Sequence, residues 1–208
     1  MLAKPLWTPQ KLSKKIMKTA IDINLTPLAD GDRQQYSALY EASFPAAERK
    51  PLAYMLEGTH ADAYDVLVLS TPDAAVAGMV ITVTHGDLTL LDYLAVSPTL
   101  RGQGLGHAAL PLIRRHVQSR RGGRLFLEIE TPPPVRDPRD ACPNPGERTR
   151  RKAFYASAGL VETGIHAFIY GSDMELLAYP EDASAITFEG YTALLAATFP
   201  ADMTAERI

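Results

Sequence analysis

Three glycines within five residues separate an apolar segment from an amphipathic one in the middle of the chain. The apolar segment, Leu88–Val96, predicts a buried strand, and residues 104–121 have the spacing of a helix. Between them lies RGQGLG, residues 101–106. Glycines let successive backbone N–H groups converge without Cβ clashes, and a helix N-terminus carries partial positive charge. The sequence therefore predicts a strand–turn–helix unit that cradles a pyrophosphate, with Arg101 at its edge.

Two common phosphate-binding loops do not fit this segment. A Walker loop would need Gly-Lys-Ser/Thr after a four-residue spacer, and that is absent. A dinucleotide-binding fingerprint has glycines at positions 1, 3 and 6, whereas here they fall at 1, 3 and 5, with His107 in place of the third. The strands before the turn are also expected to form an antiparallel meander rather than the opening of a βαβ unit.

The hydrophobic pattern of the whole chain predicts a mixed α+β domain. Strands are expected over 21–28, at a sheet edge, and over 64–70, 76–84, Leu88–Val96, Arg124–Glu130, 160–170 and 173–179. Helices are expected from an N-cap at Asp30 through Tyr40, and over 47–57, 104–121, 150–157 and 189–198. Strands Leu88–Val96 and Arg124–Glu130 are expected to be parallel neighbours. Residues 131–149, with six prolines, are expected to form an extended loop or flap without a helix.

Charge is distributed in blocks, although the formal net charge is only −3. Residues 1–18 carry +5, residues 19–100 carry −8, residues 101–152 carry +7 and residues 153–208 carry −7. The basic block favours an anionic ligand, or else the solvated face of a helix. Nucleic acid is not expected, because the pI is about 6.0 and Phe126 is the only aromatic residue from 101 to 152.

Composition also indicates where the protein is found in the cell and whether it binds a metal. No run of 18 apolar residues is present, so no membrane partner is expected, and the start of the chain lacks the apolar core of a secretory signal. The single cysteine, Cys142, cannot form an intramolecular disulfide or build a cysteine-based zinc site alone. We therefore expect a soluble cytoplasmic protein without a metal.

Two motifs resemble those of the GCN5-related N-acetyltransferases, the GNAT superfamily. Arg101–Gly106 matches the signature Arg/Gln-x-x-Gly-x-Gly/Ala of that family, and AFYASAGL, residues 153–160, is similar to its Phe-Tyr-x-x-x-Gly-Phe helix ending, with Leu160 replacing the last Phe. The resemblance covers roughly residues 20–180 and implies the GNAT fold. That fold has a mixed, mostly antiparallel sheet of about six to seven strands flanked by helices, with a parallel pair splayed at the CoA site. The expected organisation is a basic extension over 1–18, the GNAT domain over 19–180 with an inserted loop over 131–149, and a C-terminal segment over 181–208.

The resemblance also implies a site for acetyl-CoA. Pantetheine would lie against Leu94, Ala95 and Val96, where a backbone N–H would polarise the thioester carbonyl. The residues that would hold the pyrophosphate are Arg101, Gly102, Gln103, Gly104, Leu105 and Gly106. Tyr155 matches the tyrosine that protonates the departing thiolate in many members. With an ordinary pKa of about 10, a phenol can deliver that proton at neutral pH.

The base that accepts the proton of the substrate ammonium is open at this stage. Asp92 stands two residues before Leu94, so we expect it on the same face of its strand. Its alternative role is to pair with an arginine or a buried tyrosine hydroxyl. Glu130 is the second candidate and Glu128 a rival on the same strand. The histidines His107 and His166 are expected to be structural or solvated.

The function that the resemblance implies is acetyl transfer from acetyl-CoA to a primary amine by direct attack in a ternary complex. The alternative is a non-catalytic module that binds or senses acyl-CoA. The acidic blocks suggest an amine-bearing acceptor. The residues that would belong to the acceptor wall are Glu41, Phe44, Glu48 and Arg49. Cys142 is a poor candidate for a covalent acetyl carrier. Many members of the family are dimers, so a homodimer is a further expectation.

Overall fold

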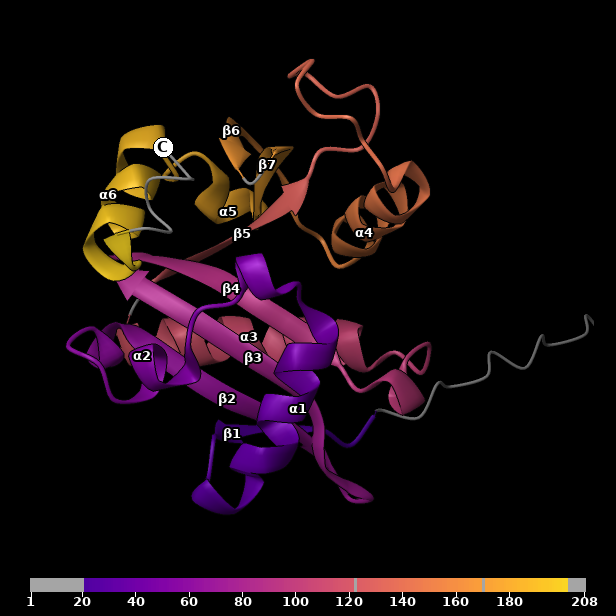
Figure 1. Cartoon of the computed structure of the whole chain (residues 1–208), viewed down its shortest axis with the longest axis vertical. Helices are drawn as coiled ribbons and strands as arrows, with labels where there is room; N and C mark the ends of the chain where they lie inside the picture. Colours follow the sequence, from indigo (N-terminus) through magenta and orange to yellow (C-terminus); the bar gives the residue numbers. More distant parts are fainter. Residues whose placement is uncertain (1–20, 122, 170, 202–208) are drawn as a thin grey trace, which may run out of the picture.

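In the described part of the chain, seven strands form one mixed sheet in the order β1-β2-β3-β4-β5-β7-β6 (Figure 1). The computed structural model describes residues 21–121, 123–169 and 171–201, so the predicted extension 1–18 lies outside the described residues. The strands are β1 (Asn24–Pro27), β2 (Tyr64–Thr71), β3 (Ala74–His85), β4 (Leu88–Val96), β5 (Arg124–Glu130), β6 (Val161–Ile169) and β7 (Ser172–Ala178). All neighbours are antiparallel except β4 and β5, which are parallel. The predicted strands and the parallel pair are confirmed, and β1 lies at a sheet edge as expected.

The helices are α1 (Arg33–Ser43), α2 (Leu52–Leu56), α3 (Leu105–Arg121), α4 (Pro145–Ser157), α5 (Pro180–Ala183) and α6 (Phe188–Thr198). Three predictions about helices were wrong. Asp30 opens a short 3-10 helix, and Asp32 is the N-cap of α1. The single helix over 47–57 is instead a 3-10 turn at Ala46–Glu48 followed by α2, because Pro51 lacks an N–H and disfavours helical geometry in the residue before it.

The third correction concerns the proline-rich segment. Helix α4 begins at Pro145, five residues before the predicted start, because proline is tolerated in the first turn of a helix. The rest of the segment is anchored by a fully buried arginine on α4. Arg148 donates to Asp140 at 2.5 Å, and Asp140 accepts from the backbone N–H groups of Cys142 and Asp173 at 2.7 and 2.9 Å. The loop is therefore fixed to α4 and β7.

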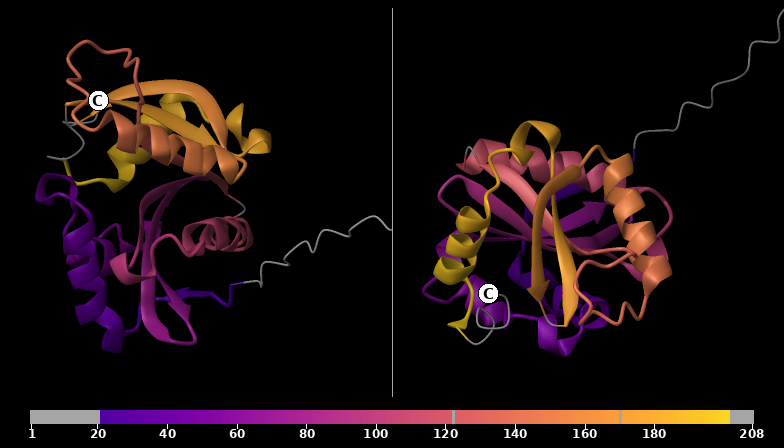
Figure 2. Two further views of the ribbon diagram at one scale, coloured as in Figure 1. Left: turned by 90° about the vertical axis from the view of Figure 1, so that its right-hand side faces the viewer. Right: turned by 90° about the horizontal axis from the view of Figure 1, so that it is seen from above.

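Two apolar cores cover the two faces of the sheet. One face, here called the α1/α6 face, packs against α1, α2 and α6 through residues such as Tyr36, Met55 and Leu194. The opposite face, the α3 face, packs against α3 through Leu110 and Ile113. Figure 2 shows α1 and α3 on opposite sides of the strands. The sheet that contains β4 and β5 thus has helices on both of its faces.

Strands β4 and β5 separate after a short paired stretch. Their parallel pairing covers only Leu88–Leu90 against Arg124–Phe126. Beyond this point β4 stays paired with β3 as far as Val96, and β5 stays paired with β7 as far as Glu130. The two strands are each held by a different neighbour, so they diverge and leave a gap in the sheet. This is the splayed pair that the family resemblance implied.

A β-bulge interrupts β4 at Asp92. Tyr93 pairs with Ile81 and Leu91 pairs with Thr82, so Asp92 is an extra residue without a partner position on β3. The bulge reverses the alternation of side chains: Leu91 and Leu94 pack on the α3 face, whereas Tyr93 belongs to the α1/α6 core. Asp92 also points to the α1/α6 side, where it meets Lys50. The prediction that Asp92 and Leu94 share a face was therefore wrong.

Candidate active site

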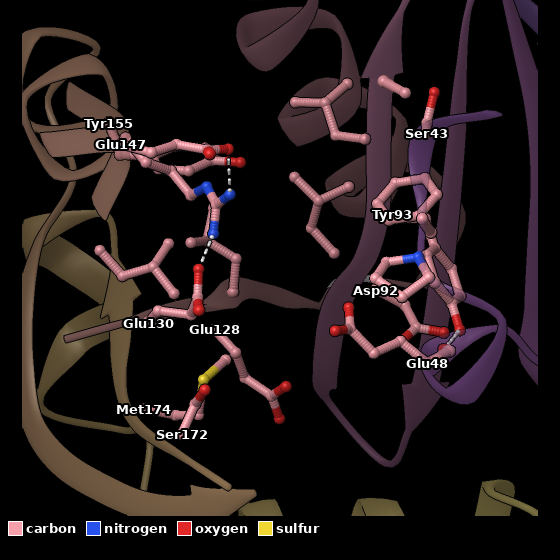
Figure 3. Close-up of a pocket in the computed structure, with 18 of the residues that line it drawn as sticks. Ser43, Glu48, Asp92, Tyr93, Glu128, Glu130, Glu147, Tyr155, Ser172 and Met174 are labelled. Atoms are coloured by element: carbon pink, nitrogen blue, oxygen red, sulfur yellow. Dashed lines mark hydrogen bonds and ion pairs between the residues drawn. The ribbon is translucent and has the colours of Figure 1, made fainter. Parts of the chain in front are cut away.

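A cavity of about 710 Å³ occupies the gap between β4 and β5 (Figure 3). The predicted site residues that line it are Asp92, Leu94, Ala95, Val96, Arg101, Glu130 and Tyr155, together with the rival Glu128. Phe44 and Glu48, predicted for the acceptor wall, also line it. Glu41 lies on α1 and Arg49 follows the 3-10 turn Ala46–Glu48, and both are outside this lining. The remaining turn residues, Gly102 to Gly106, follow Arg101 directly and lead into α3. Most of the residues selected from the sequence are thus brought together around one cavity.

The end of β4 presents backbone donors to this gap. The N–H of Ser97 donates to the carbonyl of Ala77 at 2.9 Å, so it points toward the β3 side. Because successive N–H groups of a strand point in opposite directions, those of Leu94 and Val96 point away from β3, toward the gap. Residues 94–96 therefore offer donors where the sheet has opened.

The glycines of the turn before α3 have two different roles. Gly102 and Gly104 have φ angles of 75° and 90°, which side chains with a Cβ rarely adopt. Gly106 serves packing instead, because a Cβ there would lie 3.0 Å from Cζ of Phe154 on α4. Arg101 is exposed, and its Nε donates to the carbonyl of Val96 at 3.1 Å, which links the turn to the end of β4. Backbone N–H groups at a helix N-terminus and an exposed arginine fit a pyrophosphate.

Tyr155 approaches the cavity from α4. It is half-buried, and its ring packs edge-on against Phe154 with 4.9 Å between the ring centroids. Burial raises the pKa of Tyr155 to about 12, although the nearby Arg151 guanidinium opposes the shift. The phenol is therefore protonated throughout the neutral range and available as a donor.

Asp92 is held in a buried ion pair that the sequence did not predict. Its carboxylate lies 2.5 Å from Nζ of Lys50, and the two side chains are 2% and 0% exposed. The ammonium group of Lys50 also lies 3.3 Å from the ring centroid of Phe199 and 5.1 Å from that of Tyr93. The partner is thus a lysine from the turn before α2, and not an arginine or a tyrosine hydroxyl.

The two glutamates of β5 have different surroundings. Glu130 contacts two guanidinium groups, with Arg148 at 3.0 Å and Arg151 at 2.8 Å, and Asn144 donates to it at 3.3 Å. Glu128 accepts a hydrogen bond of 2.5 Å from the hydroxyl of Tyr191 on α6. Figure 3 shows the carboxylates of Glu48 and Glu128 pointing into the cavity from opposite walls.

Lys50 and Tyr191 are among the residues that sequence reasoning missed, as are Arg148 and Arg151. Lys50 and Tyr191 are fully buried, and each contacts a carboxylate that is far away in the chain. No motif marks them, because a lysine in a proline-containing turn and a tyrosine in an apolar helix have no distinctive spacing.

The histidines and the cysteine lie apart from this chemistry. His107 interacts with the hydroxyl of Ser157 at 2.8 Å and packs on Phe154. Burial and the nearby Arg136 lower the pKa of His166 on β6. Cys142 lies in the anchored loop, outside the cavity lining. Within the described ranges, no three His, Cys, Asp or Glu side chains are grouped so that they could hold a metal ion.

Comparison with known families agrees with this arrangement. The model of the family described as "Acetyltransferase (GNAT) family" matches residues 33–134, which include the splayed strands and the glycine turn. The chain belongs to the GNAT superfamily of N-acetyltransferases. No curated protein sequence matches it significantly.

Solved structures of GNAT proteins share the fold. A putative GNAT acetyltransferase from Bacteroides thetaiotaomicron superposes with a TM-score of 0.61 at 18% identity, covering 84% of this chain and 96% of that one. A spermidine N-acetyltransferase from Vibrio cholerae in complex with CoA and spermine gives 0.57 at 12% identity, covering 75% and 94%. The ribosomal-protein-S18-alanine N-acetyltransferase from Escherichia coli gives 0.51 at 21% identity, covering 76% and 93%. The predicted GNAT fold is confirmed.

None of the helices in the described part of the chain combines the length and the apolar character needed to cross a bilayer.

Proposed function

We propose that this GNAT protein transfers an acetyl group from acetyl-CoA to a primary amine by direct attack in a ternary complex. The observation that carries the proposal is the cavity in the β4–β5 gap. Backbone donors of β4 and the hydroxyl-bearing side chain of Tyr155 line it together with the carboxylates of Glu48 and Glu128. A donor and an acceptor that enter from opposite faces of the sheet would meet in this gap.

The residues at the gap fit acetyl-CoA as co-substrate. Arg101, Gly102, Gln103, Gly104, Leu105 and Gly106 would hold the pyrophosphate at the N-terminus of α3. Leu94, Ala95 and Val96 would pair with pantetheine through their backbone. When bound, acetyl-CoA supplies the activated acyl group. The groups that bind, orient and transfer protons must come from the chain.

Among the carboxylates, we propose Glu128 as the base, with Asp92 and Glu130 as the alternatives. Asp92 is neutralised by Lys50, and Glu130 is neutralised by Arg148 and Arg151. Glu128 lines the cavity, and its carboxylate points into it.

The proposed steps follow from these positions. Glu128 takes a proton from the ammonium group, and the amine nitrogen then bonds to the thioester carbon while a backbone N–H of residues 94–96 donates to the carbonyl oxygen. Such an oxyanion donor is commonly worth about 3 kcal/mol. The C–S bond breaks, and Tyr155 donates a proton to sulfur and regains it from solvent. The ammonium loses two protons in all: one is balanced on the thiol and the other leaves to solvent.

The acceptor is proposed to be cationic. Among the described residues, five acidic ones, Glu48, Asp92, Glu128, Glu130 and Glu147, line the cavity beside two basic ones, Arg101 and Arg151. The Vibrio cholerae enzyme that shares the fold was solved with spermine, which is consistent with an acidic acceptor site on this scaffold. A cytoplasmic location and a homodimer stay predictions. A dodecameric structure of that enzyme shows only that the fold supports assembly in a relative.

Calorimetric titration with acetyl-CoA, free CoA and ATP tests the co-substrate site. We expect acetyl-CoA binding by the wild type and its loss in Gly104→Glu, where a side chain would enter a turn at φ 90°. Gly86→Glu, at φ 60° in the β3–β4 turn, is the matched control and should bind normally. No heat with any CoA species would overturn the proposal.

A panel of amines then separates catalysis from sensing. Thiol release should depend on the amine, and it should fall about 10²- to 10⁴-fold in Glu128→Gln and substantially in Tyr155→Phe. A protein that binds acetyl-CoA but releases no thiol with any amine would instead be the acyl-CoA-binding module.

A further inference from the structure

One row of side chains on α4 faces the cavity. Glu147, Arg151 and Tyr155 are spaced four residues apart, and all three line the cavity. Residues four apart on a helix are neighbours on one face. Figure 3 shows Glu147 and Tyr155 on the same wall of the cavity. Arg151 is therefore the helical neighbour of the phenol that the proposed function uses as the acid.

The guanidinium of Arg151 is held by two carboxylates. Its Nη1 lies 2.8 Å from Oε2 of Glu130 on β5, and its Nη2 lies 3.0 Å from Oε1 of Glu147. Glu130 is fixed in turn by Arg148, whose side chain is fully buried and whose Nη2 lies 3.0 Å from Oε1 of Glu130. Because two carboxylates on two different elements hold the guanidinium, its positive charge stays at one place in the cavity wall.

This charge acts on Tyr155 in a definite direction. Burial raises the pKa of the phenol to about 12, and the guanidinium of Arg151 opposes that shift. A cation stabilises a phenolate, whereas carboxylates such as those of Glu130 and Glu147 destabilise one. Arg151 therefore offsets both the burial of the phenol and the negative charge of its own two partners.

We propose that Arg151 is a positioning residue of the active site, which holds its positive charge beside Tyr155 so that this phenol can give its proton to the departing thiolate. This inference rests on the proposed function, with Tyr155 as the acid. In the step concerned, the C–S bond breaks, its electron pair stays on sulfur, and the hydroxyl proton of Tyr155 passes to that sulfur. The phenolate left behind is stabilised by the guanidinium until it regains a proton from solvent.

Other groups around the cavity also act on Tyr155. Among the described residues, the charged and titratable ones are Glu48, Asp92 with Lys50, Tyr93, Arg101, Glu128, Glu130 with Arg148, and Glu147. Replacing Arg151 by Gln leaves all of them in place. The Arg151 side chain is 36% exposed, so the shorter Gln can be accommodated there.

The measurement is the rate of acetyl transfer in a single turnover, with enzyme in excess over acetyl-CoA and with saturating amine, so that product release does not contribute. A cation close to an acid commonly lowers the pKa of that acid by about 1 to 3, and only part of this effect appears in the rate of proton donation. Arg151→Gln should therefore slow the step about 3- to 30-fold, while the Kd of acetyl-CoA stays within about twofold of wild type. Arg151→Lys keeps the charge and should recover part of the loss.

A double-mutant cycle with Tyr155→Phe shows whether Arg151 acts through the phenol. In the Tyr155→Phe chain there is no phenol proton to donate, so adding Arg151→Gln should change the rate less than about twofold. A structural or acceptor-binding role of Arg151 would instead slow both chains equally.

Arg150→Gln is the matched control. It removes the same charge from the same helix, but Arg150 is exposed and lies outside the cavity lining, so the rate should stay within about twofold of wild type. If Arg151→Gln does not fold, Glu147→Gln tests the same argument, because the Glu147 side chain is 55% exposed and Arg151 keeps Glu130. Removing this negative charge should speed the step about twofold or more, and only in chains that retain Tyr155.

The outcomes separate the inference from the proposed function. An Arg151→Gln rate equal to that of Arg150→Gln, an equal slowing with and without Tyr155, or a Glu147→Gln variant that is not faster overturns the inference while wild-type transfer remains intact. A Tyr155→Phe variant as fast as wild type also overturns it, because Tyr155 would then not be the acid. Absence of amine acetylation by the wild type overturns the proposed function itself, and the inference with it.

Discussion

The ion pair between Asp92 and Lys50 offers a test of what Asp92 does. Both side chains are almost completely buried, so removing one takes away a counter-charge that lies 2.5 Å from the other in a poorly polarisable environment. Breaking a buried pair in this way commonly costs about 3–5 kcal/mol, whereas replacing both partners by apolar residues of similar size is often neutral. We therefore expect Asp92→Leu and Lys50→Met each to lower the free energy of unfolding by about 3 kcal/mol or more. The double variant should recover most of that loss.

Urea unfolding of the four proteins gives the coupling energy between the two residues, and thiol release with a reactive amine gives kcat. If the pair is structural, the double variant is stable and keeps kcat within about tenfold of wild type, since a general base would contribute about 10²–10⁴. A double variant that is stable but loses that factor would show that Asp92 is the base. Single variants that each cost less than about 1 kcal/mol would refute the argument from burial.

Two further predictions concern stability. Gly106→Ala places a Cβ 3.0 Å from the ring of Phe154, so it should lower the free energy of unfolding in urea by about 1–3 kcal/mol. Adding Phe154→Leu to the same chain should relieve that loss. Equal losses with and without Phe154 would contradict the packing argument. Burial raises the pKa of Tyr36, Tyr93 and Tyr155, so these phenols stay protonated in the folded state after those of the unfolded chain ionise near pH 10. The contribution of these phenols to the free energy of unfolding should therefore be fully present below about pH 10 and fall progressively above it. A free energy of unfolding that stays constant to about pH 11.5 would contradict this prediction.

Much of the fold follows from local sequence. The apolar run Leu88–Val96, the glycine turn and the helix after it fix a strand–turn–helix unit, because periodicity and backbone freedom depend on neighbouring residues alone. The same holds for β5, whose predicted bounds Arg124–Glu130 are those observed. Local rules failed where prolines could act in two ways: Pro51 divides a predicted helix, whereas Pro145 begins one.

The location of the candidate site was also predictable, because the motif marks the turn and the strands on either side of it. The environment of each carboxylate could not be predicted from the sequence. Asp92 changes face because of a bulge that only the pairing with β3 reveals, and its partner Lys50 is 42 residues away. Glu128 meets Tyr191 across 63 residues.

The sequence by itself thus determined where a strand opens into a glycine turn and a helix. The tertiary structure alone decided that Asp92 meets Lys50, that Glu130 meets Arg148 and Arg151, and that the hydroxyl of Tyr191 donates to Glu128. The physical reason is that backbone conformation depends mainly on adjacent residues, whereas the electrostatic environment of a buried charge depends on groups brought close by packing from distant parts of the chain.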